Sequence, residues 1–171
     1  TAASNVLGKI LPLMRIGELC KKQGILFGVD AAQAAGVLPI NMKSMNIDYL
    51  CVAPHKGLFA PMGTGILIAR KPIEKTIVEG GTGTESLEFM QPNTLPEMLE
   101  SGTVNLPGIV SVAAGIDFVK NKSSCVLKYE NELVKRLYAG LQSTDIVFYT
   151  NPNDFGYGPV ICFNVLNLPS E

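Results

Sequence analysis

The sequence of 171 residues predicts an α/β fold built on a largely parallel sheet flanked by helices. Apolar runs of strand length, ILFGVD (25–30) and IDYLCVAP (47–54), alternate with a segment of helical periodicity and end at polar residues. The links between them are short, as in chains that repeat strand, helix and strand. A chain of this length suffices for one domain or for one and a half.

The first element is predicted to be a helix in the stretch LPLMRIGELCKKQG (11–24). Leu13, Ile16 and Leu19 share one helical face, and Gly24 follows the basic residues of the last turn. After the strand run at 25–30, the polar stretch NMKSMN (41–46) is predicted to be a short helical piece. A third strand is expected at TGILIAR (64–70).

The second half of the chain begins with a long excursion, residues 71–105, that is rich in Gly, Thr, Pro and Glu. Long loops inside compact domains are usually functional or disordered. Two helical patterns follow, at 107–122 and at 125–142, and then two strand-like runs at 145–150 and 159–168.

Composition restricts the possible partners and location. The net charge is −1 and no basic run occurs, which argues against nucleic acid, and no apolar stretch is long enough to span a bilayer. Hydrophobic residues make up 47% and charged residues 17%, so we expect buried strands or a face covered by another domain or subunit. No secretory signal is visible, and the opening TAASNVLGKI suggests the interior of a longer protein.

The cysteines favour a reducing, cytoplasmic location and give no metal site. No CxxC pair occurs, and one histidine cannot complete a zinc set with thiols so widely separated. The four cysteines are Cys20, Cys51, Cys125 and Cys162.

Polar residues stand at the ends of two predicted parallel strands. Asp30 ends the first strand, and His55 and Lys56 follow the second. Ligands of open α/β sheets bind outside the carboxyl ends of the strands, so these three side chains are expected at one edge.

A lysine at such an edge can form a Schiff base with a carbonyl compound such as pyridoxal 5′-phosphate (PLP). PLP enzymes also need a carboxylate beside the pyridine nitrogen, a role that suits Asp30. Gln33 could donate to the ring oxygen, and His55 could contact cofactor or substrate. The alternative is that Asp30 caps the following segment and His55–Lys56 is a solvated loop.

Two further motifs are weaker. EGGTGTES (79–86) offers amides and hydroxyls for a phosphate but lacks the P-loop lysine, so a flexible turn is the alternative. ESGTVN (100–105) is equally explained as a helix entry. Other chemistries lack their motifs, since GxSxG, HExxH and GxGxxG after a strand do not occur.

Five segments in order resemble the middle of a class V aminotransferase, a fold type I PLP-dependent transferase, and are most similar to the cysteine desulfurase family. They cover roughly residues 3–116 and read SNVLGKILPL, GILFGVDAAQAAGVLPINM, NIDYLCVAPHKGLFAPMGTGIL, GGTGTES and LESGTVNLPGI. The resemblance implies that residues 1–120 are part of the PLP-binding large domain. Residues 121–171 would begin an incomplete small C-terminal α/β domain.

The resemblance also implies individual roles around the cofactor. Lys56 would form the Schiff base and act as the catalytic lysine, and Asp30 would pair with the pyridine nitrogen. Gln33 would bond the ring oxygen, and His55 would act beside the phosphate as a second catalytic residue. Asn5 would face the cofactor and substrate.

By the same resemblance, Gly81, Thr82 and Thr103 would approach the active site of the other subunit in a homodimer. Two positions depart from the family. Ala53 replaces a serine that commonly donates to the phosphate, and Pro54 replaces a common glycine. Phosphate binding would then depend more on parts outside this chain.

The function implied is that of a PLP-dependent cysteine desulfurase, in which L-cysteine gives L-alanine and a sulfur transferred to an enzyme cysteine outside this chain. None of the four cysteines stands at a matching place, so the chain is expected to be an inactive fragment by itself. A sulfur-acceptor protein is a possible partner. The alternatives are a class V aminotransferase or lyase, and a non-catalytic PLP-fold protein used in dimerisation or partner binding.

Overall fold

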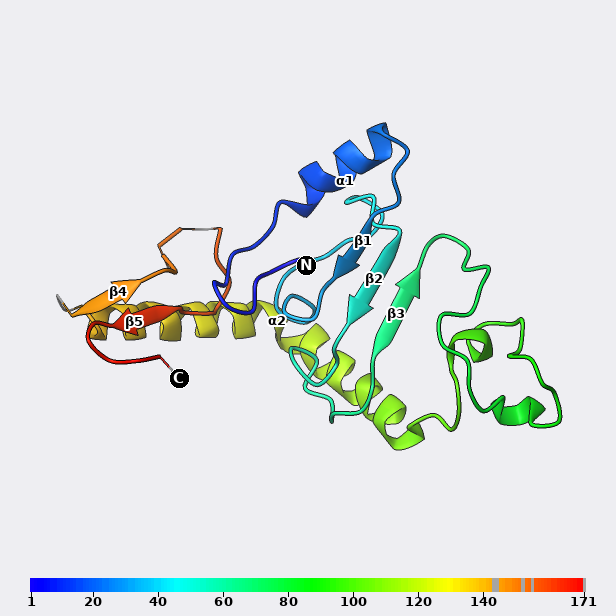
Figure 1. Cartoon of the computed structure of the whole chain (residues 1–171). Coiled ribbons are helices and arrows are strands. Elements are labelled where there is room, and N and C mark those ends of the chain that lie inside the picture. Colours follow the sequence, from blue (N-terminus) through cyan, green and yellow to red (C-terminus); the bar gives the residue numbers. More distant parts are fainter. Residues whose placement is uncertain (143–144, 152, 155, 171) are drawn as a thin grey trace.

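The structure, a computed structural model, describes residues 1–142, 145–151, 153–154 and 156–170. It is a mixed α/β chain with a three-stranded sheet, a two-stranded sheet and two α-helices along these residues (Figure 1). The elements in chain order are α1 (Leu13–Lys22), β1 (Gly28–Asp30), β2 (Tyr49–Val52), β3 (Ile66–Ala69), the 3₁₀ helices η1 (Gly83–Glu85) and η2 (Glu97–Leu99), α2 (Leu106–Gly140), β4 (Ile146–Phe148) and β5 (Phe163–Val165).

The three-stranded sheet has one parallel and one antiparallel pair. β1 pairs with β2 in parallel, with Asp30 opposite Cys51, whereas β3 runs antiparallel to β2. The expectation of a largely parallel sheet is therefore wrong for this last strand. A parallel return needs a crossover, usually a helix, and the 13 residues between β2 and β3 form turns instead.

The core lies between α1, the sheet and the turns that follow β1. Ile47, Ala31 and Ala34 are fully buried, and Leu13 brings α1 onto the same cluster. Gly17 of α1 lies directly against the Met45 carbonyl, where a larger residue would not fit. Parts of the apolar runs thus form the core, but the expectation of buried strands is wrong for Ile25 and Leu26 before β1, which are exposed.

The stretch at 41–46 is a set of hydrogen-bonded turns, and the expected short helix does not form. The Asn41 side chain accepts from the Ser44 N–H at 3.0 Å, and the Met45 N–H donates to the Asn41 carbonyl. Asn46 has φ +52°, which ends the turn in the left-handed region. Local side-chain bonds of this kind compete with helix formation.

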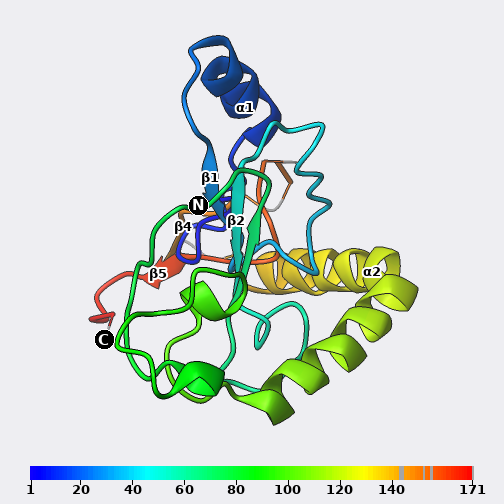
Figure 2. The same cartoon turned by 90° about the vertical axis from the view of Figure 1, so that its right-hand side faces the viewer.

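The helical patterns at 107–122 and 125–142 form one continuous helix of 35 residues, α2, rather than two helices. Asn105 caps its N-terminus by accepting from the Gly108 N–H. No proline interrupts the helix after Pro107, so nothing in the polar stretch between the two patterns ends it. Figure 2 shows α1 and α2 at opposite ends of the three-stranded sheet.

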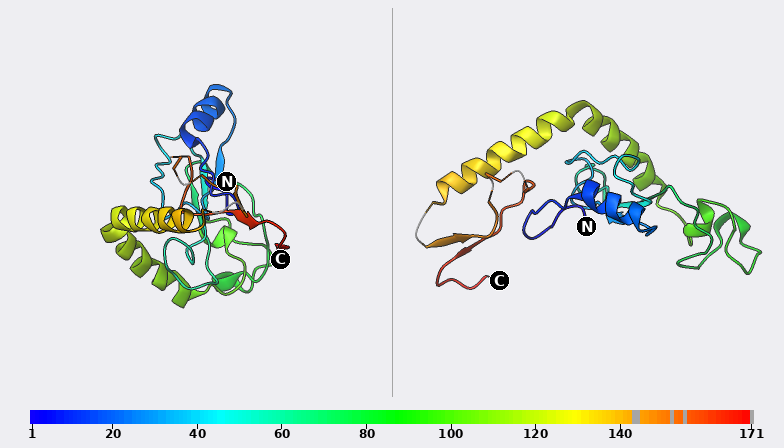
Figure 3. Two further views of the ribbon diagram at one scale, coloured as in Figure 1. Left: turned by 90° about the vertical axis from the view of Figure 1, so that its left-hand side faces the viewer. Right: turned by 90° about the horizontal axis from the view of Figure 1, so that it is seen from above.

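The second half of α2 runs toward the hairpin of β4 and β5, which Figure 3 shows at the opposite end of the molecule from residues 71–105. The Tyr138 ring of α2 and the Phe148 ring of β4 lie 4.5 Å apart between centroids. The expected boundary after residue 120 lies inside α2, and the assignment of residues 121–171 to a small domain stays a prediction.

The expected long excursion at 71–105 contains only the two 3₁₀ helices. Its apolar side chains are mostly outside the core, as Leu87 and Phe89 are 94% and 102% exposed. Leu67 and Ile68 of β3 are also exposed. Within the described ranges, no helix combines the length and apolarity needed to cross a membrane.

Candidate active site

Asp30 and the His55–Lys56 pair lie at the same edge of the sheet, as the sequence predicts. β1 and β2 are parallel neighbours, and the Ala31 N–H donates to the Cys51 carbonyl at 2.8 Å just beyond Asp30. The carboxyl ends of both strands therefore open onto the same space, where α/β sheets hold their ligands.

The loop between β2 and β3 (residues 53–65), called the Lys56 loop below, is held by close backbone contacts on two sides. Gly36, at φ +85°, faces the Gly57 carbonyl so closely that a Cβ would overlap it, and Gly57 faces the Ala35 carbonyl in the same way. On the other side, Gly115 of α2 lies against the Leu58 carbonyl. The Lys56 loop is thus held between the turns after β1 and helix α2.

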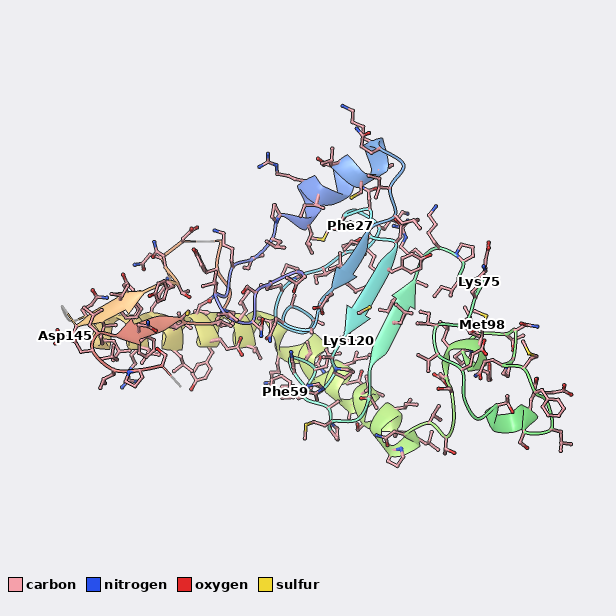
Figure 4. The ribbon with its side chains drawn as sticks, viewed as in Figure 1. Phe27, Phe59, Lys75, Met98, Lys120 and Asp145 are labelled. Carbon is pink, nitrogen blue, oxygen red and sulfur yellow. The ribbon has the colours of Figure 1, made fainter. Side chains whose placement is uncertain are left out.

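An aromatic contact adds to this packing. The rings of Phe59 and Phe118 meet edge to face with centroids 5.2 Å apart. Figure 4 labels Phe59 beside α2, at the end of the sheet away from Phe27. Such pairs add about 1 kcal/mol beyond the burial of their area.

A cavity of about 230 Å³ lies beside this loop. Five separate parts of the chain form it: the N-terminal turn, the turns after β1, the Lys56 loop, helix α2, and the C-terminal segment. Its polar side chains are those of Ser4, Gln33, Lys56 and Glu130, and its apolar wall includes Val37, Leu38, Phe59, Val126 and Val160.

The residues predicted for the cofactor differ in their surroundings. Asp30 is exposed, and its Oδ1 accepts from the Ala32 N–H at 2.9 Å. The alternative that Asp30 caps the following segment is therefore correct for this oxygen. The same hydrogen bond orients the carboxylate at the sheet edge. His55 and Lys56 are exposed, and their side chains make no hydrogen bond or ion pair with the described residues. Gln33 is half-buried in the cavity wall.

Asn5 is not among the residues that line the cavity. It is exposed in a turn in which the Ser4 hydroxyl accepts from the Val6 and Leu7 N–H groups, at 3.2 and 3.0 Å. Ser4 and Gly8, on either side of Asn5, do line the cavity. The structure therefore brings this turn to the site without placing the Asn5 side chain in the wall.

The glycine–threonine loop and the ESGT stretch lie side by side. The Gly102 N–H donates to the Gly81 carbonyl at 2.7 Å, and the Thr82 hydroxyl donates to the Glu85 carbonyl at 2.7 Å. Thr103 is exposed next to this contact. None of the three predicted residues lines the Lys56 cavity of its own chain.

Glu130 of α2 is a cavity residue that the sequence reasoning missed. Its Oε2 is buried without a hydrogen-bond partner among the described residues, and burial raises the pKa of this carboxyl above its usual range. Glu130 stands 74 positions after Lys56 in the sequence. No spacing rule joins residues so far apart, so only the folded chain could reveal it.

Comparison with known proteins identifies the family. The family described as aminotransferase class-V matches residues 1–171. The chain belongs to the class V aminotransferase family. The cysteine desulfurase and class V aminotransferase families depend on PLP, and the resemblance seen in the sequence is confirmed.

Individual class V relatives carry cysteine desulfurase names. A probable cysteine desulfurase of Pyrococcus abyssi (strain GE5 / Orsay) is 34% identical over 95% of this chain and 42% of the relative. The mitochondrial cysteine desulfurase of Candida maltosa is 32% identical over 96% of this chain and 32% of the relative. The apo structure of a cysteine desulfurase from Thermococcus onnurineus NA1 has a TM-score of 0.78, with 32% identity over 97% of this chain and 43% of that structure.

The chain spans less than half the length of these relatives. It therefore corresponds to a part of a class V protein, and the prediction of a fragment is confirmed.

The residues present fit PLP. The cofactor needs an amine to attach to, a carboxylate for the ring nitrogen and neutral donors for its oxygens. The chain offers such groups: the Lys56 amine and the Gln33 amide line the cavity, and the Asp30 carboxylate ends β1 at the same sheet edge, outside the cavity lining.

Proposed function

We propose that this chain is the lysine-bearing part of a PLP-dependent cysteine desulfurase. The observation that carries the proposal is the Lys56 loop, held between Gly36 and Gly115 at the strand edge that also presents Asp30. The class V family and the cysteine desulfurase names of its relatives support the reaction.

The roles follow from the groups at this edge. PLP, when bound, supplies an electron sink for bond changes at the carbons of an amino acid. Lys56 Nζ would hold the cofactor covalently and would also move protons as a general base. Asp30 holds the proton on the ring nitrogen, and Gln33 donates to the ring oxygen.

His55 acts beside the cofactor phosphate and Asn5 beside the substrate. In the whole protein, L-cysteine is the substrate and L-alanine the product. The sulfur passes to a cysteine outside this chain and then to an acceptor protein.

The second subunit of a homodimer completes the site. Gly81, Thr82 and Thr103 lie together on an exposed loop and are absent from the cavity of their own chain, which supports a role at the neighbouring subunit. The exposed Leu87 and Phe89 of the same excursion supply apolar area that such an interface would cover.

A class V aminotransferase or lyase is the second candidate, because it would use the same lysine and aspartate. It predicts no L-alanine from L-cysteine, because transamination or elimination gives an oxo acid instead. A cytoplasmic location is proposed from the scattered cysteines, and the mitochondrial relative of Candida maltosa leaves an organelle as the alternative.

The test is the visible absorbance of the full-length protein with PLP, for the parent and for Lys56→Ala. We expect a band of bound PLP in the parent and its loss in Lys56→Ala, because no other amine in the described residues lines the cavity. Lys71→Ala is the matched control, since Lys71 is an exposed lysine outside the cavity.

Sulfide and alanine production from L-cysteine is measured next, with a thiol reductant present that releases the transferred sulfur as sulfide. Equal sulfide and alanine in the parent, and neither in Lys56→Ala, supports the desulfurase. A PLP band without L-alanine points to the aminotransferase or lyase. No band in the parent contradicts both and leaves the non-catalytic fold.

A further inference from the structure

The N-terminal turn that borders the cavity is tied to the C-terminal part of the chain by a buried hydroxyl. Thr150 is 1% exposed. Its hydroxyl donates to the Leu7 carbonyl at 2.9 Å and accepts from the Cys162 N–H at 2.9 Å. One side chain thus joins the N-terminal turn, 143 positions away, to the backbone of Cys162.

Backbone hydrogen bonds also connect the N-terminal turn with the C-terminal segment 156–160, and we call this contact the junction. The Gly158 N–H donates to the Gly8 carbonyl at 2.7 Å, and the Ile10 N–H donates to the Gly156 carbonyl at 2.8 Å. Gly8 has φ +69°, and a Cβ there would lie 2.7 Å from the Val160 carbonyl oxygen. The N-terminal turn and the segment 156–160 are therefore in direct contact.

An ion pair lies on the outer side of the junction. Lys9 Nζ is 3.6 Å from Asp154 and 4.4 Å from the centre of the Tyr157 ring. Both charged side chains are about half exposed, at 45% and 48%, so this pair contributes little. Among the side chains of the junction, the buried Thr150 hydroxyl has the larger effect, since its loss would leave two backbone groups unpaired.

Both sides of the junction line the Lys56 cavity. Ser4 and Gly8 come from the N-terminal turn, and Gly158, Pro159 and Val160 come from the C-terminal segment. Thr150 itself does not line the cavity. The distance between these two segments therefore affects the width of the cavity that Lys56 lines.

We propose that Thr150 is a positioning residue that holds the Ser4–Gly8 turn, with Asn5 on it, as one wall of the Lys56 cavity. It acts through the Leu7 carbonyl and touches neither cofactor nor substrate. The proposal rests on the proposed function for the ligand, PLP, but its geometric part concerns the turn alone.

The test uses the full-length protein with Thr150→Val, which keeps the shape of the side chain and removes both hydrogen bonds. PLP affinity is measured by titration of the visible band into protein freed of cofactor. We expect Thr150→Val to weaken PLP binding about tenfold, and Thr150→Ser to restore it because the hydroxyl is back.

Ile47→Val is the control for a general loss of stability. Ile47 is fully buried in the sheet core and does not line the cavity, so this change lowers stability without touching the junction. Equal weakening of PLP binding in Ile47→Val and Thr150→Val would overturn the proposal, as would unchanged binding in Thr150→Val.

A second measurement separates this proposal from the proposed function, because it needs no PLP. Amide hydrogen exchange is followed at Leu7, Gly8 and Gly158, whose N–H groups Thr150 does not contact. Faster exchange at these amides in Thr150→Val, but not in Thr150→Ser, is expected. If only Cys162 exchanges faster, Thr150 does not position the turn, even where PLP binds. If the parent fails to bind PLP while the turn loosens in Thr150→Val, the proposed function fails and the positioning role stands.

Discussion

Two glycine-containing regions of this chain carry residues predicted for the active site, and they are held in different ways. Around Lys56, Gly36 and Gly115 bring backbone from the turns after β1 and from α2 onto the same loop. In the excursion at 71–105, Gly83 and Gly102 have nothing close to the position a Cβ would take.

The two regions therefore differ in what holds them: other elements of this chain hold the Lys56 loop, whereas the Gly81–Gly102 contact lies within the excursion itself. The Lys56 loop is in close backbone contact with the turns after β1 and with α2, so contacts within this chain hold it. The Gly81–Gly102 contact sits among exposed apolar side chains, so its place relative to a cofactor depends on what covers them.

The largest effect is expected from Gly36→Ala, with Gly83→Ala as its matched control. Both glycines have positive φ, +85° and +59°, but only Gly36 faces a backbone carbonyl. Overpacking and the left-handed backbone together should lower the free energy of unfolding by about 4 kcal/mol for Gly36→Ala and about 1 kcal/mol for Gly83→Ala. Urea unfolding of the full-length protein measures both, and equal losses would remove the distinction between the two regions.

Truncation of apolar side chains should show the same difference on a smaller scale. Ile47 is fully buried and Leu87 is 94% exposed. Ile47→Ala should cost about 3 kcal/mol of unfolding free energy, and Leu87→Ala less than about 0.5 kcal/mol. A Leu87→Ala cost close to that of Ile47→Ala would mean that the excursion is part of a core in the whole protein. The shift in the urea midpoint decides this.

The smallest effect is a pH dependence at Glu130. Burial raises the pKa of this carboxyl in the folded chain, so the folded state binds its proton more tightly than the unfolded state does. Glu130 therefore disfavours folding above its raised pKa, and the penalty disappears as pH falls below the usual glutamate range.

Glu130→Gln removes this titration. Relative to the parent, the variant should gain thermal stability at pH 7 and lose that advantage at pH 4. Glu132→Gln is the control, because Glu132 is exposed on the same helix and outside the cavity. A gain that is the same at both pH values would show that the carboxyl does not titrate differently in the folded state.

Local patterns predicted much of what surrounds Asp30 and Lys56. The periodicity of Leu13, Ile16 and Leu19 predicted α1, and the apolar runs before Asp30 and His55 predicted two strands whose ends meet. These predictions succeed because helix and strand periods depend on residues a few positions apart. The split of α2 into two helices failed because a polar stretch without a breaker does not end a helix.

By itself, the sequence determined the family, the helix and strands before the excursion, and the common edge for Asp30 and Lys56. Only the tertiary structure decided that β3 is antiparallel and that the cavity is formed jointly by Ser4, Lys56, Glu130 and Val160. The physical reason is distance along the chain. A buried hydroxyl such as Thr150 bonds Leu7 across 143 positions, and no local propensity records a contact of that kind.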